Sequence, residues 1–229
     1  MSAQQHTYLL GHDTRTVACL EVRESGHEAA FLLPHLKPGL RLLDCGCGPG
    51  TISVGLAKAV APGEMVGLDT EMPQVQAAAA RATELGIANA VFEVGDLTDL
   101  RYDDETFDVV FAHAVVMLLP EPAAGLAEMS RVTKPEGIVA IRDPISDASI
   151  CAQENPLFHE GFKLFARAVA EAGGDVSRGR DPGRCCRRPV SRGSSSPSAS
   201  SSRALPTIAC ASTAPGPVCG MAPRSPRRW

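Results

Sequence analysis

Short apolar segments alternate with longer amphipathic segments through most of the chain. The apolar segments have the length and composition of buried strands, and the segments between them repeat apolar residues at helical spacing. Strands are therefore predicted at 40–44, 64–69, 90–94, 107–112 and 138–143, and helices at 52–60, 72–85, 123–132 and 155–172. Strands that alternate with helices indicate an α/β fold with a doubly wound, mostly parallel sheet.

The segment before the first strand has only helical periodicity. Two amphipathic helices are predicted there, at about 16–23 and 27–33, and Pro34 and Pro38 end helix formation before the sheet begins. We therefore expect residues 1–38 to form a helical cap on the N-terminal side of the core.

A cap of this kind can close over a site at the carboxyl ends of the strands. Tyr8 and His12 carry polar groups on this segment and are candidates for contact with a substrate, as is His27. The alternative for each is an ordinary surface position, because polar residues on a surface helix usually have no further role.

Three glycines at alternate positions follow the first strand and lead into the first core helix. Gly46, Gly48 and Gly50 remove side chains from this turn, so that a ligand can approach the backbone closely. The helix that follows presents unpaired amides at its N-terminus. Strand, glycine loop and helix together predict a site for a nucleotide-like ligand.

A carboxylate stands at the end of each of the first three strands. Asp44, Asp69 and Asp96 would meet at one edge of a parallel sheet. A pyrophosphate would be repelled by Asp44 and Asp96, whereas an acid about 20 residues past the loop binds ribose in any adenosine. The three acids suit a cationic ligand with an ammonium group and an adenine, and S-adenosylmethionine is such a ligand.

Five motifs in register carry a family resemblance. In order and spacing they resemble the successive motifs of class I S-adenosylmethionine-dependent methyltransferases, and most closely the small-molecule branch akin to the ubiquinone and menaquinone biosynthesis enzymes. The motifs are LLDCGCGPG at 42–50, VGLD at 66–69, GDL at 95–97, FDVVFAH at 107–113 and KPEG at 134–137. The resemblance covers about residues 36–145, and it departs from the family at Glu136, where a glycine is usual.

The resemblance implies a role for each motif. The loop glycines would lie beneath the methionine part of the cofactor with Cys47 beside them, and Asp44 would lie near the cofactor's amino group. Asp69 would bind the ribose hydroxyls, with Thr70 next to it. The adenine would be contacted by Gly95, Asp96 and Leu97.

The implied reaction is methyl transfer to an oxygen, nitrogen or carbon nucleophile of a small-molecule acceptor. Ala112 and His113 would flank the sulfonium, and His113 is the candidate general base because imidazole can take a proton near neutral pH. One alternative is a cofactor-binding protein without activity. Another is a nicotinamide-dependent oxidoreductase. The glycine loop of such an enzyme would have the motif Gly-x-Gly-x-x-Gly, whereas the glycines here fall at every second position.

Charge divides the chain into two unlike parts. The chain has 229 residues and a net charge of −4, but residues 1–176 carry −13 and residues 177–229 carry +9. An acidic body argues against nucleic acid as a partner.

No metal site is expected, because the eight cysteines include no C-x-x-C pair. Without a signal-peptide pattern or an apolar span, we expect a cytoplasmic protein with its core at 39–176.

The basic segment 177–229 has the composition of a disordered tail rich in Ser, Pro and Arg. Family members continue here into two more strands, and the codons from near Asp181 permit a helix end and a turn in a shifted reading frame. We therefore hypothesise a frameshift that removes the last two strands. In that case the strand at 138–143 would be an exposed edge through which chains could self-associate.

Overall fold

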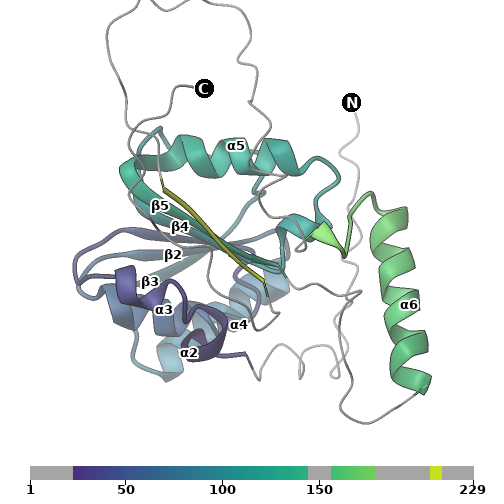
Figure 1. Cartoon of the computed structure of the whole chain (residues 1–229). Coiled ribbons are helices and arrows are strands. Elements are labelled where there is room, and N and C mark those ends of the chain that lie inside the picture. Colours follow the sequence, from purple (N-terminus) through teal and green to yellow (C-terminus); the bar gives the residue numbers. More distant parts are fainter. Residues whose placement is uncertain (1–22, 144–155, 179–206, 213–229) are drawn as a thin grey trace, which may run out of the picture.

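The computed structural model of the chain describes residues 23–143, 156–178 and 207–212, and its centre is one parallel sheet (Figure 1). The strand order is β3-β2-β1-β4-β5-β6, and every neighbouring pair is parallel. The strands are β1 Leu42–Cys45, β2 Met65–Asp69, β3 Ala90–Val94, β4 Phe107–His113, β5 Thr133–Asp143 and β6 Thr207–Ser212. The predicted doubly wound α/β fold is confirmed.

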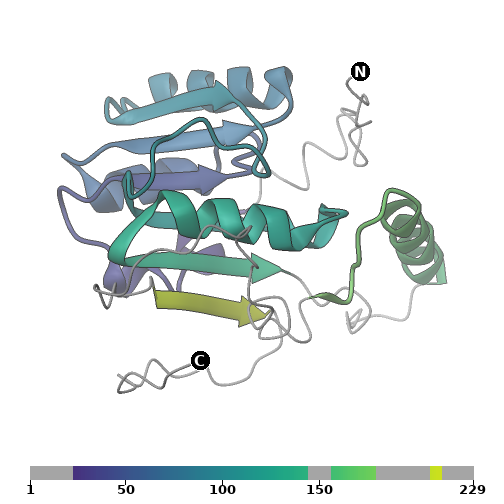
Figure 2. The same cartoon turned by 90° about the horizontal axis from the view of Figure 1, so that it is seen from above.

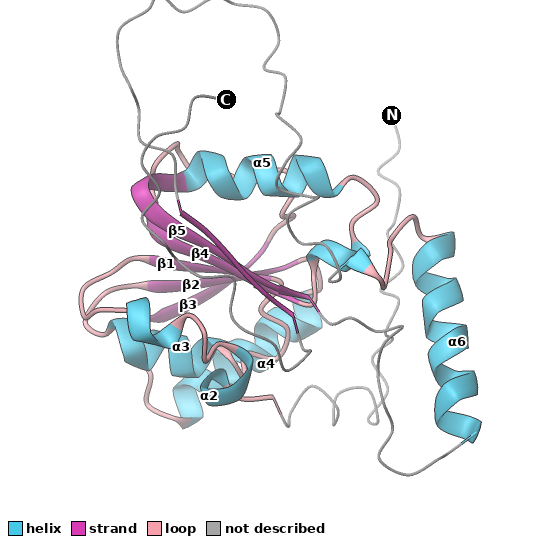
Figure 3. Ribbon diagram, viewed as in Figure 1, coloured by secondary structure: helices cyan, strands magenta, loops and turns pink. Residues whose placement is uncertain are grey.

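Helices cover both faces of the sheet (Figure 3). The short α2 and the helices α3 and α4 lie on one face, α5 lies on the other, and α6 stands beyond the carboxyl ends of the strands (Figure 2). Their bounds are α2 Ser25–Glu28, α3 Ser53–Val60, α4 Met72–Glu84, α5 Pro122–Val132 and α6 Pro156–Glu171, with 3-10 turns η1 Leu33–His35 and η2 Val116–Leu118. No helix in the described ranges is long and apolar enough to cross a membrane.

The central strands are apolar on both faces because each face has its own core. Leu42 of β1 packs in the core beneath α2 and α3 with Phe111 of β4, whereas the adjacent Leu43 packs in the core beneath α5 with Val110. All four side chains are fully buried. This explains why the strand segments are continuous apolar runs in the sequence and do not alternate with polar residues.

The strand order reverses between β1 and β4, and a ligand crevice is expected at that point. Connections from β1 lead toward β2 and β3, and those from β4 lead toward β5 and β6. The same order occurs in dinucleotide-binding proteins, so the topology locates the site without selecting its ligand.

Two expectations about the ends of the core were wrong. The helix predicted at 27–33 is a single turn, α2, which ends at Glu28 and is followed by turns and by η1, with Pro34 in its first turn. The segment after 177 contains β6, which pairs with β5 from Ile138↔Thr207 to Asp143↔Ser212, so β5 is not the sheet edge. The helix predicted at about 16–23 lies almost entirely outside the described residues.

The turn inside β5 carries a strained residue. Glu136 has a φ of +64°, in the left-handed region that glycine tolerates best. This is the position at which the chain departs from the family motif. The departure therefore costs backbone strain here, on the order of 1 kcal/mol.

Candidate cofactor-binding site

A cavity of about 670 Å³ opens at the carboxyl ends of the central strands. Its wall combines the glycine loop after β1, the end of β2, the segment after β3 and the segment from the end of β4 into α5. It therefore lies where the strand order reverses, as expected.

The glycine loop folds back on β2. The amides of Gly46 and Cys47 both donate to the Leu68 carbonyl, at 2.7 and 2.9 Å. A Cβ at Gly46 would lie 2.2 Å from Val115 Cγ2, whereas a Cβ at Gly48 would meet nothing within 4 Å. Gly48 lines the cavity, so its missing side chain leaves room for a ligand.

Asp44 is the buried acid at the end of β1, with an exposed fraction of 2%. Its Oδ2 accepts a hydrogen bond from Ser53 Oγ at the start of α3, at 2.6 Å. Burial raises the pKa of Asp44 from 3.8 to about 7, the Ser53 hydrogen bond opposes this, and the charge of Asp69 adds to it. The Asp44 charge is therefore costly until a cation approaches.

Asp69 at the end of β2 is held by backbone amides. Gly48 N–H donates to Oδ2 at 2.9 Å and Glu71 N–H donates to Oδ1 at 3.0 Å. Burial still raises the pKa of Asp69, although these hydrogen bonds favour the ionised form. The Gly48 contact ties this carboxylate to the glycine loop, so the two predicted elements form one site.

The charge of the cavity wall is strongly negative among the described residues. One cation, Arg23, lines the cavity together with five acids. The acids are Asp44, Asp69, Glu71, Asp96 and Glu121. A pyrophosphate would be repelled there and a cationic ligand attracted, which favours a sulfonium nucleoside over a nicotinamide dinucleotide.

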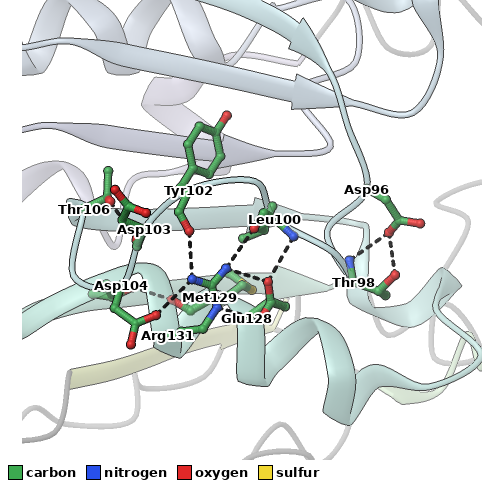
Figure 4. A network of polar contacts seen from close by, with 11 residues as sticks. Asp96, Thr98, Leu100, Tyr102, Asp103, Asp104, Thr106, Glu128, Met129 and Arg131 are labelled. Carbon is green, nitrogen blue, oxygen red and sulfur yellow. Dashed lines mark hydrogen bonds and ion pairs between the residues drawn. The ribbon is translucent and has the colours of Figure 1, made fainter.

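The segment after β3 is fixed to α5 by one guanidinium (Figure 4). Arg131 donates to the carbonyls of Leu100 and Tyr102, at 2.8 and 2.7 Å, and pairs with Glu128 at 2.8 Å. Asp96, near the start of the same segment, accepts hydrogen bonds from the amide and the hydroxyl of Thr98, both at 2.7 Å. The network holds in place the segment whose first residues line the cavity.

His113 ends β4 on the same face of the sheet as Asp44. Its Nε2 lies 3.0 Å from Glu28 Oε2 of α2, and Arg142 of β5 donates to the same oxygen. Burial lowers the pKa of His113 to about 4; the charges of Arg23 and Arg142 act in the same direction, and Glu28 opposes them. His113 is therefore neutral at physiological pH.

Most residues predicted for the cofactor line this cavity. They are Asp44, Gly46, Cys47, Gly48, Asp69, Thr70, Gly95, Asp96 and Leu97, and the predicted base His113 lines it as well. Burial raises the pKa of the Cys47 thiol, so the thiol stays protonated and is a poor nucleophile.

Two predicted residues are not among those that line the cavity. Gly50 packs against α4, where a Cβ would lie 2.8 Å from Ala78 Cβ, and Ala112 is fully buried in the core beneath α5. His27 is exposed and also does not line the cavity, and Tyr8 and His12 lie outside the described residues.

The sequence analysis missed Glu28 and Arg142, which surround His113. They contact each other across 114 positions in the sequence. Neither belongs to a motif, and no local pattern marks either residue.

A family model described as "Methyltransferase domain" matches residues 36–173. The chain belongs to this methyltransferase family. The resemblance found in its motifs is therefore confirmed.

Individual relatives agree with this assignment. The chain is 40% identical to the probable methyltransferase ltbC of Aspergillus luteorubrus over 63% of this chain and 54% of that protein. It is 36% identical to nocamycin O-methyltransferase of Saccharothrix syringae over 50% of this chain and 41% of that protein. The chain thus spans about half the length of these relatives.

A solved structure agrees with the fold. A SAM-dependent methyltransferase from Aquifex aeolicus has a TM-score of 0.54 and 24% identity, over 69% of this chain and 88% of that chain. The shared fold supports the architecture described above.

Replacing Asp44 by Asn tests its raised pKa. Because the folded state binds this proton more tightly than the unfolded state does, stability is lost as the pH rises from about 4 to about 7. Asn keeps an acceptor for Ser53 and removes the charge. We expect Asp44→Asn to be more stable than the wild type at pH ~8 in urea unfolding, with a gain that shrinks toward pH ~4. A variant that is less stable at both pH values would contradict the pKa.

Proposed function

We propose that this chain binds S-adenosylmethionine in the acidic cavity and transfers the methyl group to a nucleophile of a small-molecule acceptor. The observation that carries the proposal is the pair of buried carboxylates, Asp44 and Asp69, held beside the glycine loop. Two buried anions without a cation are costly, and a ligand with an ammonium and a sulfonium group offsets that cost.

The residues present fit this cofactor. Asp69 would accept hydrogen bonds from the ribose hydroxyls. Asp44, whose pKa is about 7, would be ionised when it pairs with the cofactor's amino group. Asp96 would accept a hydrogen bond from the adenine amino group, and the buried Leu97 would pack against the adenine face. The open space at Gly48 leaves room for the methionine part.

The bound cofactor would supply an activated methyl group, so the protein need only orient the acceptor, exclude water and receive a proton. His113 is placed to interact with the acceptor, since it lines the cavity and its buried Nδ1 has no hydrogen-bond partner among the described residues. A neutral imidazole whose pKa is about 4 is a weak base. We therefore assign His113 to accept a hydrogen bond that orients the nucleophile and to take up its proton as the methyl bond forms.

The segment from the end of β4 into α5 forms a mostly apolar wall of the cavity. Val115, Leu118, Leu119, Pro120 and Ala124 line it there, together with the acid Glu121. These side chains suit a small, largely apolar acceptor with one polar nucleophile. Two relatives are named as methyltransferases of small molecules, nocamycin and demethylmenaquinone, which supports the same class.

Removing the ribose-binding acid tests the cofactor assignment. We expect Asp69→Ala to weaken S-adenosylmethionine binding by about tenfold to a hundredfold in calorimetric titration, because a charged hydrogen-bonding partner is lost. Asp99→Ala is the control, since Asp99 is exposed and is not among the cavity-lining residues. Equal affinity of the wild type and Asp69→Ala for S-adenosylmethionine would contradict the assignment of Asp69 to the ribose.

The role of His113 can be measured separately. We expect His113→Ala to lower turnover by about a hundredfold with the best acceptor from a panel of phenols, quinols and amines. The affinity for S-adenosylmethionine should change little, because His113 is assigned to the acceptor. Turnover close to that of the wild type would remove His113 from the reaction.

A further inference from the structure

His113 is surrounded by charged groups from two other elements. Glu28 lies on α2 and Arg142 on β5, where it is the register partner of His113. Arg142 also donates to the His27 carbonyl at 2.9 Å, and Glu28 Oε1 lies 3.2 Å from His27 Nδ1. Arg23 precedes α2 and adds its charge. The end of α2 is thereby attached to the ends of β4 and β5.

The contact with Glu28 assigns the proton on the imidazole. A hydrogen bond from His27 and the charge of Arg142 hold the pKa of Glu28 below its usual range against burial, so this group is a carboxylate and can only accept. Nε2 of His113, 3.0 Å away, must therefore be the donor. Since the ring is neutral, its other nitrogen, Nδ1, carries a lone pair.

In the part of the chain that the structure describes, that lone pair has no partner. Nδ1 is buried and unpaired, while the histidine itself lines the cavity and is 9% exposed. A buried acceptor without a partner is unfavourable, and a donor group on a ligand would relieve it. The opposite tautomer would place a hydrogen on Nδ1 and leave two acceptors, Nε2 and the carboxylate, facing each other.

We infer that Glu28 is a positioning residue, which holds His113 in the Nε2–H tautomer and keeps Nδ1 as the acceptor for the nucleophile's hydrogen. The tautomer assignment does not depend on which cofactor or acceptor is bound, whereas its effect on turnover rests on the proposed function. It also follows that His113 is correctly protonated only while α2 is in contact with β4. The segment that precedes the sheet thus takes part in the reaction through the contact of Glu28 with His113.

The test reads the tautomer directly by ¹H–¹⁵N correlation spectra of the histidine ring in the full chain. We expect a single Nε2–H form in the wild type, a mixture of tautomers in Glu28→Ala, and recovery of the single form in Glu28→Gln, which keeps an acceptor oxygen. Turnover should fall about tenfold in Glu28→Ala with an unchanged KM for S-adenosylmethionine. Glu24→Ala is the matched control, because Glu24 is exposed next to α2 and its side chain makes no capping bond.

The outcomes separate the two claims. A wild-type ring with its proton on Nδ1, or an unchanged tautomer in Glu28→Ala, would overturn the inference. A tautomer that responds as expected, with no methyl transfer by any variant, would count against the proposed function instead. If Glu28→Ala does not fold, the double variant Glu28→Met/Arg142→Met removes both charges together, and the same loss of the single tautomer is expected.

Discussion

Two carboxylates are buried at the same edge of the sheet, and the rest of this site compensates the cost of their charges. Asp44 and Asp69 stand at the ends of neighbouring parallel strands, where β1 and β2 bring them to the same edge of the sheet. Water cannot screen them there, and each raises the cost of the other's charge. The hydrogen bonds from Ser53 and from the Gly48 and Glu71 amides reduce that cost without removing it, since both pKa values stay raised. A cationic ligand would offset the remaining cost of the two negative charges, and an anionic ligand would increase that cost.

Charge changes sign across this edge of the sheet. The acids occupy the ends of β1 and β2, whereas the cation Arg142 lies near the end of β5 on the same face, beside the neutral His113 of β4. Glu28 of α2 pairs with Arg142 from outside the sheet. The cofactor half is therefore built by the strand ends and the segments that directly follow them, while the half assigned to the acceptor needs a segment that precedes the sheet.

The parts of this arrangement that depend on local patterns could be predicted from the sequence. The strands β1, β2 and β4 are largely apolar runs because both of their faces are buried, and the ends of β1 and β2 in the sequence locate Asp44 and Asp69. The contact of Glu28 with His113 spans 85 positions and leaves no local trace. β6 was missed because Thr207–Ser212 consists mostly of small residues with weak strand preference, which a parallel neighbour can nonetheless pair.

The most direct test of the acidic site is calorimetric titration of S-adenosylmethionine at about pH 6 and about pH 7.5, with NADH titrated beside it and Asp44→Asn as the control. The cationic ligand favours the ionised form of Asp44, so the account predicts affinity that rises several-fold between these pH values in the wild type and stays flat in the variant. It also predicts no measurable binding of NADH. Binding of NADH at least as tight as that of S-adenosylmethionine, or an affinity that falls with rising pH in the wild type, would contradict it.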